Sequence, residues 1–82
     1  MMEVCVLLFG PQAASAGRDS ISVSLPPGAT CADLREILVS RAPALRDSLK
    51  ESRIALNCNF ADDSTTIGAT DEVALIGLVS GG

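Results

Sequence analysis

Two apolar runs near opposite ends of the chain constrain its fold more than any other feature. Val4–Phe9 and Glu72–Leu78 have the length of strands, contain β-branched residues and, apart from Glu72, are apolar at odd and even positions alike. Because successive side chains of a strand point to opposite faces of a sheet, neither run has a polar face to turn toward water. Each run therefore suits a central strand, or a strand whose second face meets a partner.

A second strand and a loop follow the first run. Ser20–Leu25 alternates between serine and apolar residues, which predicts a half-buried edge strand. Its inward-facing residues are Ile21, Val23 and Leu25. We expect this strand to form an antiparallel hairpin with the first run. The small-residue loop between them has room for one helical turn over Gln12–Ala16.

One main helix is expected over Cys31–Arg41. Thr30 is a favourable N-cap, and Asp33 three residues later completes a start that resembles a capping box. The apolar stripe of the helix consists of Leu34, Ile37 and Leu38. Proline cannot continue a helix, so this one should end before Pro43. A short second helix over Pro43–Lys50 would bury Leu45 and Leu49.

The remaining segments complete a β-β-α-β-(β)-β order. Ile54–Phe60 is predicted to be the third strand, and Thr65–Ile67 a short edge strand or an irregular connection. One helix can cover only one face of a sheet. This order favours an α+β fold, the β-grasp (ubiquitin-like) roll. It is a mixed four- to five-stranded sheet crossed by one main helix, with the first and last strands side by side in the middle. Residues 1–82 are predicted to form a single domain, with 77–82 as a flexible C-terminal Gly-Gly tail.

Composition argues against several classes of function. The net charge is −4, and the chain has no Trp or Tyr and only two Phe, so nucleic-acid binding fits poorly. There is no His and no CxxC, and Cys5, Cys31 and Cys58 lie far apart in sequence, so no metal site is expected. The cysteines are predicted to be small buried hydrophobes in a reducing compartment. Val4–Phe9 is too short for a signal peptide or a membrane span, so we expect a cytoplasmic (cytosolic) location without membrane contact.

Acidic pairs and thiols offer no convincing catalytic site. Asp62-Asp63 and Asp71-Glu72 are interpreted as solvated turns rather than metal ligands, and a docking role toward a basic partner stays open for Asp71 and Glu72. Cys58 has no neighbouring base to activate it and is assigned to core packing. Without a His or a P-loop, the chain is predicted not to be catalytic alone.

The C-terminal tail is the strongest candidate for chemistry. Gly77–Gly82 is made of small and apolar residues and ends in a free Gly81-Gly82 carboxylate. Glycine has no Cβ, so this end can pass through a narrow channel and approach a reacting centre closely. Six extended residues span roughly 20 Å, enough to enter the active site of a partner. We interpret the Gly82 carboxylate as the working group and the domain as its scaffold.

Several stretches together resemble one protein family. They are Leu8-Phe9-Gly10, Ala16-Gly17-Arg18, Pro27–Thr30, Leu56-Asn57, Asp71–Ala74 and Val79–Gly82. In this order, over the whole chain, they resemble the small, sulfur-carrying subunit of molybdopterin synthase. Two positions depart from the family's common pattern. Ala69-Thr70-Asp71 stands where the family commonly has Gly-Asp-Glu. Gly77-Leu78 stands where it commonly has two prolines, which predicts a less stiff exit of the tail.

The resemblance implies a reaction at Gly82. An E1-like enzyme would adenylate its carboxylate with ATP, and a persulfide sulfur would replace AMP to leave a C-terminal thiocarboxylate. The sulfur would pass to a pterin precursor held by the large subunit of molybdopterin synthase, in a heterotetramer of two small and two large subunits. Val79, Ser80 and Gly81 would carry Gly82 into the partner. The resemblance implies no cofactor bound by the chain itself.

The resemblance also implies a partner-binding patch formed by Phe9, Phe60 and Ile76. One helix leaves a sheet face uncovered, which agrees with such a patch. Phe60, however, shares parity with Leu56 in the predicted strand Ile54–Phe60, so a bulge would be needed to bring it to the partner's side.

Other functions are compatible with the same features. A sulfur carrier for thiazole synthesis or tRNA thiolation shares the fold and the Gly-Gly end. A ubiquitin-like modifier would form an isopeptide bond through Gly82. A structural β-grasp module would use neither terminal glycine.

Overall fold

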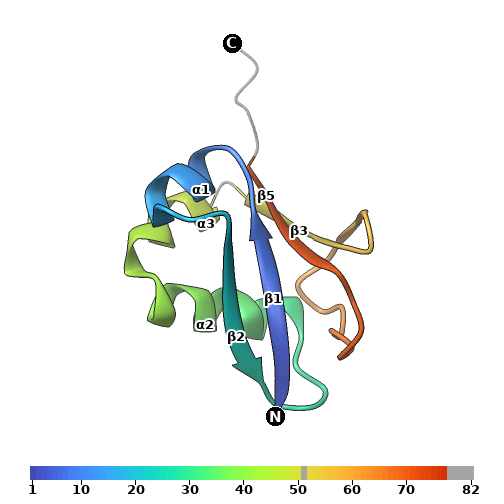
Figure 1. Cartoon of the computed structure of the whole chain (residues 1–82). Coiled ribbons are helices and arrows are strands. Elements are labelled where there is room, and N and C mark those ends of the chain that lie inside the picture. Colours follow the sequence, from blue (N-terminus) through green and yellow to red (C-terminus); the bar gives the residue numbers. More distant parts are fainter. Residues whose placement is uncertain (51, 78–82) are drawn as a thin grey trace.

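A five-stranded mixed sheet with its helices on one face makes up the fold (Figure 1). The computed structural model describes residues 1–50 and 52–77. The strands are β1 (Met2–Leu8), β2 (Ser20–Leu25), β3 (Ser52–Leu56), β4 (Asn59–Ala61) and β5 (Val73–Gly77). The helices are α1 (Pro11–Ala16), α2 (Cys31–Arg41), the 3₁₀ turn η1 (Pro43–Leu45) and α3 (Arg46–Lys50). The strand order is β2-β1-β5-β3-β4.

The two apolar runs do form the middle of the sheet. β1 and β5 pair in parallel, with Val6 opposite Val73 and Leu8 opposite Leu75. All four of these side chains are buried. The prediction of adjacent central strands is confirmed, and with it the β-grasp arrangement.

The hairpin between β1 and β2 also forms as expected. The two strands are antiparallel, with Val4 opposite Val23, and β2 is an edge strand. The three predicted inward residues of β2 are buried, while Ser22 and Ser24 are exposed. The loop before β2 carries α1, which extends the expected turn by one residue at its start.

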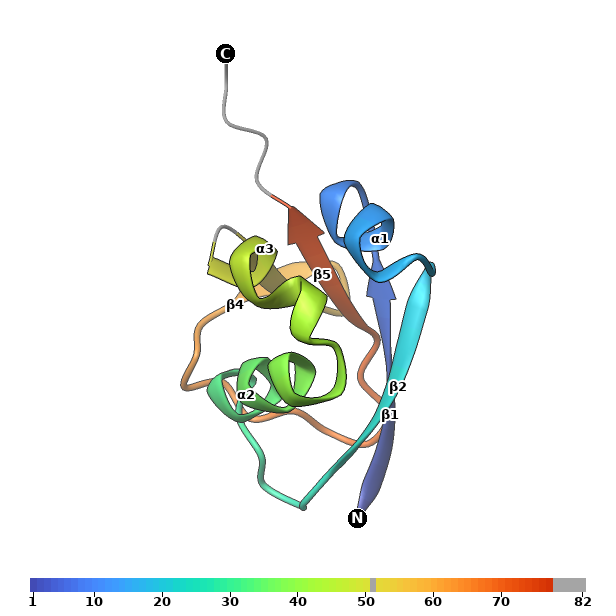
Figure 2. The same cartoon turned by 90° about the vertical axis from the view of Figure 1, so that its left-hand side faces the viewer.

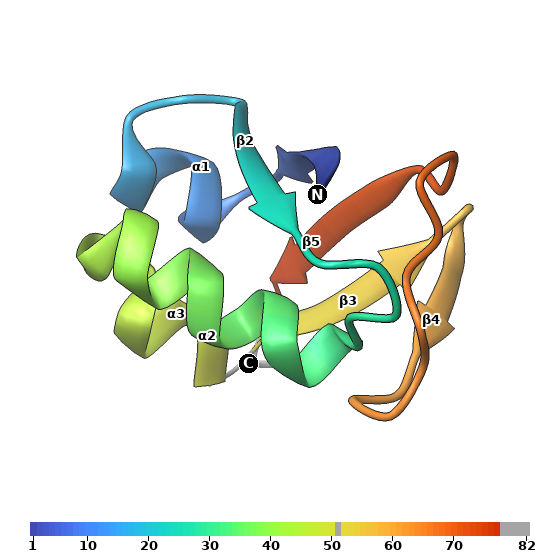
Figure 3. The ribbon, with the colours of Figure 1, turned by 90° about the horizontal axis from the view of Figure 1, so that it is seen from below.

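Helix α2 begins and ends where its sequence signals lie. The Thr30 side chain accepts a hydrogen bond from the Asp33 backbone N–H, and the Asp33 carboxylate accepts one from the Thr30 N–H, which is a complete capping box. Leu34 and Leu38 are fully buried and Ile37 is half-buried. Figure 2 shows α2 and α3 on the same side of β1 and β2, and Figure 3 shows α2 running along that face from below.

The segment after α2 is less regular than predicted. A single helix over Pro43–Lys50 was expected, whereas the structure has a 3₁₀ turn followed by a five-residue α-helix. Leu45 and Leu49 are buried as expected. Thr65–Ile67 proves to be an irregular connection, with one bridge between Thr66 and Thr30. No helix of the described residues is long and apolar enough to cross a membrane.

The predicted third strand is wrong in its second half. Ile54–Phe60 was expected to be continuous, but the chain reverses at Asn57-Cys58, and Leu56 pairs with Asn59 across this two-residue turn. Both turn residues have positive φ, 53° and 69°, which is the requirement of a type I′ hairpin turn. The signal in the sequence is Asn57, the first of two asparagines that interrupt the apolar run, since Asn tolerates the left-handed region.

This turn gives a prediction for stability. Cys58 has a Cβ at a φ of 69°, where glycine carries no steric penalty. Cys58→Gly should therefore raise the free energy of unfolding by up to about 1 kcal/mol, measured by thermal or urea unfolding. Ser22→Gly places glycine in the extended strand β2 and should lower stability instead. A lower stability for Cys58→Gly than for the unaltered protein would contradict the turn geometry.

Candidate functional site

The sheet face opposite the helices carries a continuous apolar row. Leu7 of β1 pairs with Ala74 of β5, Ala74 pairs with Ala55 of β3, and Ala55 pairs with Phe60 of β4. Paired residues on neighbouring strands point to the same face of a sheet. The row therefore crosses four strands on one side, and no helix of the described residues covers it (Figure 2).

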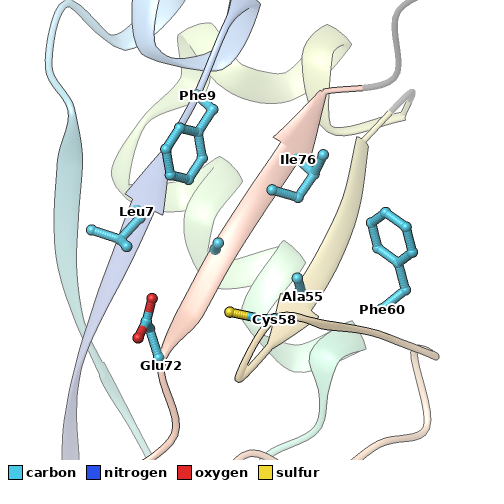
Figure 4. Close-up of a pocket in the computed structure, with 8 residues that line it drawn as sticks. Leu7, Phe9, Ala55, Cys58, Phe60, Glu72 and Ile76 are labelled. Carbon is cyan, nitrogen blue, oxygen red and sulfur yellow. The ribbon is translucent and has the colours of Figure 1, made fainter.

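A shallow hollow of about 320 Å³ lies along this row. Figure 4 shows the residues that line it, which come from β1, β5, the β3–β4 hairpin and their ends. They are Leu7, Phe9, Ala55, Cys58, Phe60, Glu72, Ala74 and Ile76. Glu72 is the single charged member of this set. We call this surface the open face.

The three predicted partner-binding residues share the open face. Phe9 and Phe60 are 50% and 55% exposed, and Ile76 lies between them in the view of Figure 4. Apart from Met1, these two phenylalanines are the exposed large hydrophobic residues of the described chain. Exposed apolar patches of this kind mark interaction surfaces. The structure therefore gathers Phe9, Phe60 and Ile76 on one surface, while their contact with a partner stays a prediction.

The parity argument against Phe60 is wrong. It assumed that Leu56 and Phe60 lie on one straight strand, but the turn at Asn57-Cys58 reverses the chain between them. Leu56 is buried toward the helices, whereas Phe60 pairs with Ala55 on the opposite side. No bulge is needed for Phe60 to reach the open face.

The sequence reasoning missed several members of the open face. Leu7, Ala55 and Ala74 were not proposed as site residues. Leu7 could have been found from its alternation with Phe9, and Ala74 from its alternation with Ile76, whereas Ala55 needs the register between β3 and β5. Arg53 was also missed. Its guanidinium lies 4.4 Å from the centroid of the Phe60 ring, a cation–π contact that holds the ring at the edge of the sheet.

Two of the three cysteines do not pack in the core. Cys31 is buried as predicted, and burial, followed by the charge of Asp63, raises the pKa of its thiol. Cys5 and Cys58 are exposed, so their assignment to the core is wrong. Cys5 occupies the outward-facing parity of β1, and Cys58 sits at the tip of the hairpin turn. An apolar neighbourhood in sequence does not reveal which face of a strand is covered.

The acidic pairs have structural roles. Asp71 accepts hydrogen bonds from the Gly68 backbone N–H at 2.7 Å and from the Asn57 side-chain amide at 2.9 Å. These donors lower the pKa of its carboxyl group below the ordinary value. Asn57 in turn accepts from the Glu72 N–H at 3.0 Å, so the pair ties the β3–β4 turn to the start of β5. Asp63 forms an ion pair with Arg35 at 3.0 Å.

Other parts of the predicted site have mixed outcomes. Among residues 1–50 and 52–77 no group of three or more acidic or thiol side chains is placed to hold a metal ion. Glu72 lies at the hollow, so its docking role stays a prediction. The predicted tail residues Val79, Ser80, Gly81 and Gly82 lie outside the described residues, as does Leu78. Of the predicted tail 77–82, Gly77 is described, and it is the last residue of β5.

The described part of β5 ends at its last pair with β3. Gly77 pairs with Ser52 of β3. Gln12 of α1 lies beside this rung and donates a hydrogen bond from Nε2 to Ser52 Oγ. The sheet topology and the apolar open face define a domain of the β-grasp, ubiquitin-like class.

The family follows from comparison with known proteins. The chain belongs to the ThiS family, whose model matches residues 6–82. It is similar to a molybdopterin synthase sulfur carrier subunit of Arabidopsis thaliana, with 31% identity over 81 residues that cover 99% of this chain and 84% of that protein. The expected resemblance to this family is thereby confirmed.

Solved structures agree with this assignment. The crystal structure of small archaeal modifier protein 1 from Haloferax volcanii is 28% identical, with a TM-score of 0.87 and coverage of 98% of this chain and 99% of that one. In the complex of subunits 1 and 2 of molybdopterin-converting factor from Helicobacter pylori, the matched chain is also 28% identical. Its TM-score is 0.71, with coverage of 99% of this chain and 100% of that one.

The Asp71 carboxylate predicts a pH dependence of stability. Its pKa is lowered on folding, so it stabilises the fold at pH values above the unfolded pKa of about 3.9, and this contribution is lost as the pH falls through the lower folded pKa. Asp71→Asn should therefore lower stability at neutral pH, and the difference from the unaltered protein should shrink below about pH 4.

Urea unfolding over a pH series measures this difference. Asp19→Asn removes the same charge from an exposed loop and serves as the control. If the stability gap between the unaltered protein and Asp71→Asn were the same at neutral and at strongly acid pH, the assigned ionisation would be wrong.

Proposed function

We propose that this chain is the sulfur-carrying small subunit of a molybdopterin synthase, with the Gly82 carboxylate as its working group. The observation that carries the proposal is the near-full-length similarity to a sulfur carrier subunit. The ThiS-family match, which extends to residue 82, and the apolar open face beside the tail's exit support it. The chain then contributes a reactive end and a docking surface.

The first half of the reaction activates the carboxylate. A carboxylate is a poor electrophile because its negative charge repels nucleophiles. We propose that an E1-like enzyme supplies ATP, that a Gly82 oxygen attacks the α-phosphate, and that pyrophosphate leaves. The terminal sulfur of a persulfide then attacks the carbonyl carbon and AMP leaves. A second thiol cleaves the resulting acyl disulfide, is itself oxidised to a disulfide, and releases the thiocarboxylate.

The second half of the reaction takes place on the partner. The thiocarboxylate delivers its sulfur to a pterin precursor held by a large subunit, and two such transfers would complete a dithiolene. The chain has no His and no phosphate-binding loop motif, and this proposal assigns it neither an acid–base role nor a nucleotide site. In this proposal ATP is a substrate of the activating enzyme rather than a cofactor of the carrier.

The open face is the proposed docking surface for the large subunit. Its centre is apolar, its two exposed phenylalanines would be buried on docking, and aromatic side chains are frequent anchors at interfaces. The matched Helicobacter pylori chain was solved in a complex of two subunits, which supports a partner of this type. Two small and two large subunits are the proposed stoichiometry.

A protein modifier is the second candidate function. The favouring observation is the close fold match to small archaeal modifier protein 1. A modifier would join Gly82 to a lysine amine instead of exchanging oxygen for sulfur. Carriers for thiazole synthesis or tRNA thiolation remain further alternatives, since they would undergo the same activation and differ in the acceptor.

Intact mass spectrometry tests the activation step. Incubation with the E1-like enzyme, ATP and a persulfide donor should add the mass difference between sulfur and oxygen at the C-terminus. Deletion of Gly82 should abolish this gain while leaving the melting temperature unchanged. Covalent attachment to lysines of other proteins without any sulfur gain would favour the modifier, and no change with the cognate enzyme would sink both ideas.

Charge placed on the open face tests the docking proposal. Phe60→Asp should weaken binding to the large subunit at least tenfold, about 1.4 kcal/mol, because the new carboxylate would be desolvated against an apolar partner. Ser40→Asp adds the same charge on the exposed surface of α2 and should bind normally. Isothermal calorimetry measures both affinities. Equal affinities for the two variants would remove the open face from the interface.

A further inference from the structure

We propose that Gln12 is a positioning residue that seats Gly77 and so fixes where the tail leaves the sheet. The proposal rests on the proposed function, because it matters only if Gly82 must reach a partner's active site. It adds a residue from α1 that neither the tail nor the open face contains.

Gln12 is unusual for its burial. It is 2% exposed, although it is polar and lies on a short surface helix. Its Nε2 donates to Ser52 Oγ, and Ser52 is itself buried. Buried amides are usually hydrogen-bonded, and this bond orients the Gln12 side chain toward Ser52. Gln12 thus links α1 to the last rung of β3 and β5.

Gly77 has no room for a side chain in this arrangement. A Cβ built on Gly77 would lie 3.1 Å from Gln12 Cδ and Nε2 and closer still to Oε1. To make room, the buried amide of Gln12 would have to shift, which would disturb its hydrogen bond to Ser52. Gly77 and Gln12 therefore fit together: the Gln12 amide occupies the space that a side chain at position 77 would need.

We call the contact of Gln12 with Ser52 and Gly77 the seat. Ser52 is also hydrogen-bonded to the main helix. The backbone carbonyl of Ser52 accepts a hydrogen bond from Arg35 Nη2 at 2.9 Å, and Arg35 also donates to the Leu49 carbonyl at 2.8 Å. Arg35 belongs to α2 and is paired with Asp63. The chain of contacts runs from the main helix through Ser52 to Gln12, so the seat is tied to the rigid part of the domain.

The Gln12 contact and the open face lie on opposite sides of the end of β5. Ile76 faces the open face, and the next residue, Gly77, faces Gln12. Phe9 and Gln12 belong to one turn, in which the Gln12 N–H donates to the Phe9 carbonyl at 3.3 Å. A partner docked on the open face therefore meets a tail whose starting point is fixed relative to the docking surface.

This arrangement has a kinetic consequence. Five residues beyond Gly77 span at most about 17 Å, so the reach of Gly82 depends closely on where the tail begins. If the end of β5 frays, the tether lengthens and the effective concentration of the carboxylate at the partner's active site falls. Loss of the seat should therefore slow the transfer step without weakening docking.

The test separates these two quantities. Gln12→Ala should lower kcat for sulfur transfer from the thiocarboxylated carrier to the large subunit's pterin substrate by about tenfold, with KM for the carrier unchanged within twofold. Val23→Ala, a core truncation in β2 away from the seat, is the control for lost stability. It should leave kcat unchanged even where its melting temperature falls as far as that of Gln12→Ala. Equal kcat values for Gln12→Ala and the unaltered carrier overturn the proposal.

A double-mutant cycle tests the contact between Gln12 and Gly77 itself. Gly77→Ala should slow transfer about tenfold in the unaltered chain but less than threefold further in the Gln12→Ala background, because the clash is then gone. Additive effects of the two substitutions overturn the pairing. If Gln12→Ala does not fold, Ser52→Ala removes the hydrogen-bond partner and should give the same split between kcat and KM; a normal kcat for it overturns the proposal.

Failure of the seat is distinguishable from failure of the proposed function. Thiocarboxylation of the unaltered carrier is measured first by intact mass. If the unaltered chain gains no sulfur, the proposed function fails and the seat, as a device for sulfur transfer, fails with it. If it gains and transfers sulfur while Gln12→Ala does so at the same rate, only the seat is wrong.

Discussion

The parallel pairing of β1 with β5 is the constraint on which the rest of the structure depends. It joins the two ends of the chain at the middle of the sheet and buries Val6, Leu8, Val73 and Leu75 beneath the helices. A parallel pair cannot be closed by a tight turn, so a long connection must lie between its strands in sequence. Here that connection contains the hairpin partner β2, the main helix and the β3–β4 hairpin. β5, the last strand of the described residues, therefore ends in the middle of the sheet.

The helices cover only one face of the sheet, which leaves the open face exposed. The main helix and the short segments after it shield one side of the sheet, while the other side keeps its apolar row from Leu7 to Phe60. Strands that are apolar at every position are therefore explained by two different partners: the helices of this domain and, in our proposal, another protein. In the ThiS family setting, the open face would hold the carrier in place while its end reacts.

The end of β5 lies both in the middle of the sheet and beside the open face. Ile76 lines the open face, whereas a side chain at Gly77 would point toward the buried Gln12 on the other face. The glycine at 77 was noted in the sequence as a departure from a proline pattern. Its contact with Gln12 gives that departure a structural reason, since the buried amide fills the space that a side chain would need.

The sequence by itself determined the hairpin of the first two strands, the central position of the end strands, the limits of α2 and the family, because these depend on local periodicity, capping and contiguous motifs. It also named Phe9, Phe60 and Ile76, through the resemblance. Only the tertiary structure decided that the chain turns at Asn57-Cys58, that Cys5 and Cys58 are exposed, and that Gln12 lies against Gly77. The reason is physical: which face of a strand is covered, and which residues 65 positions apart come together, depend on how elements pack, and no local pattern carries that information.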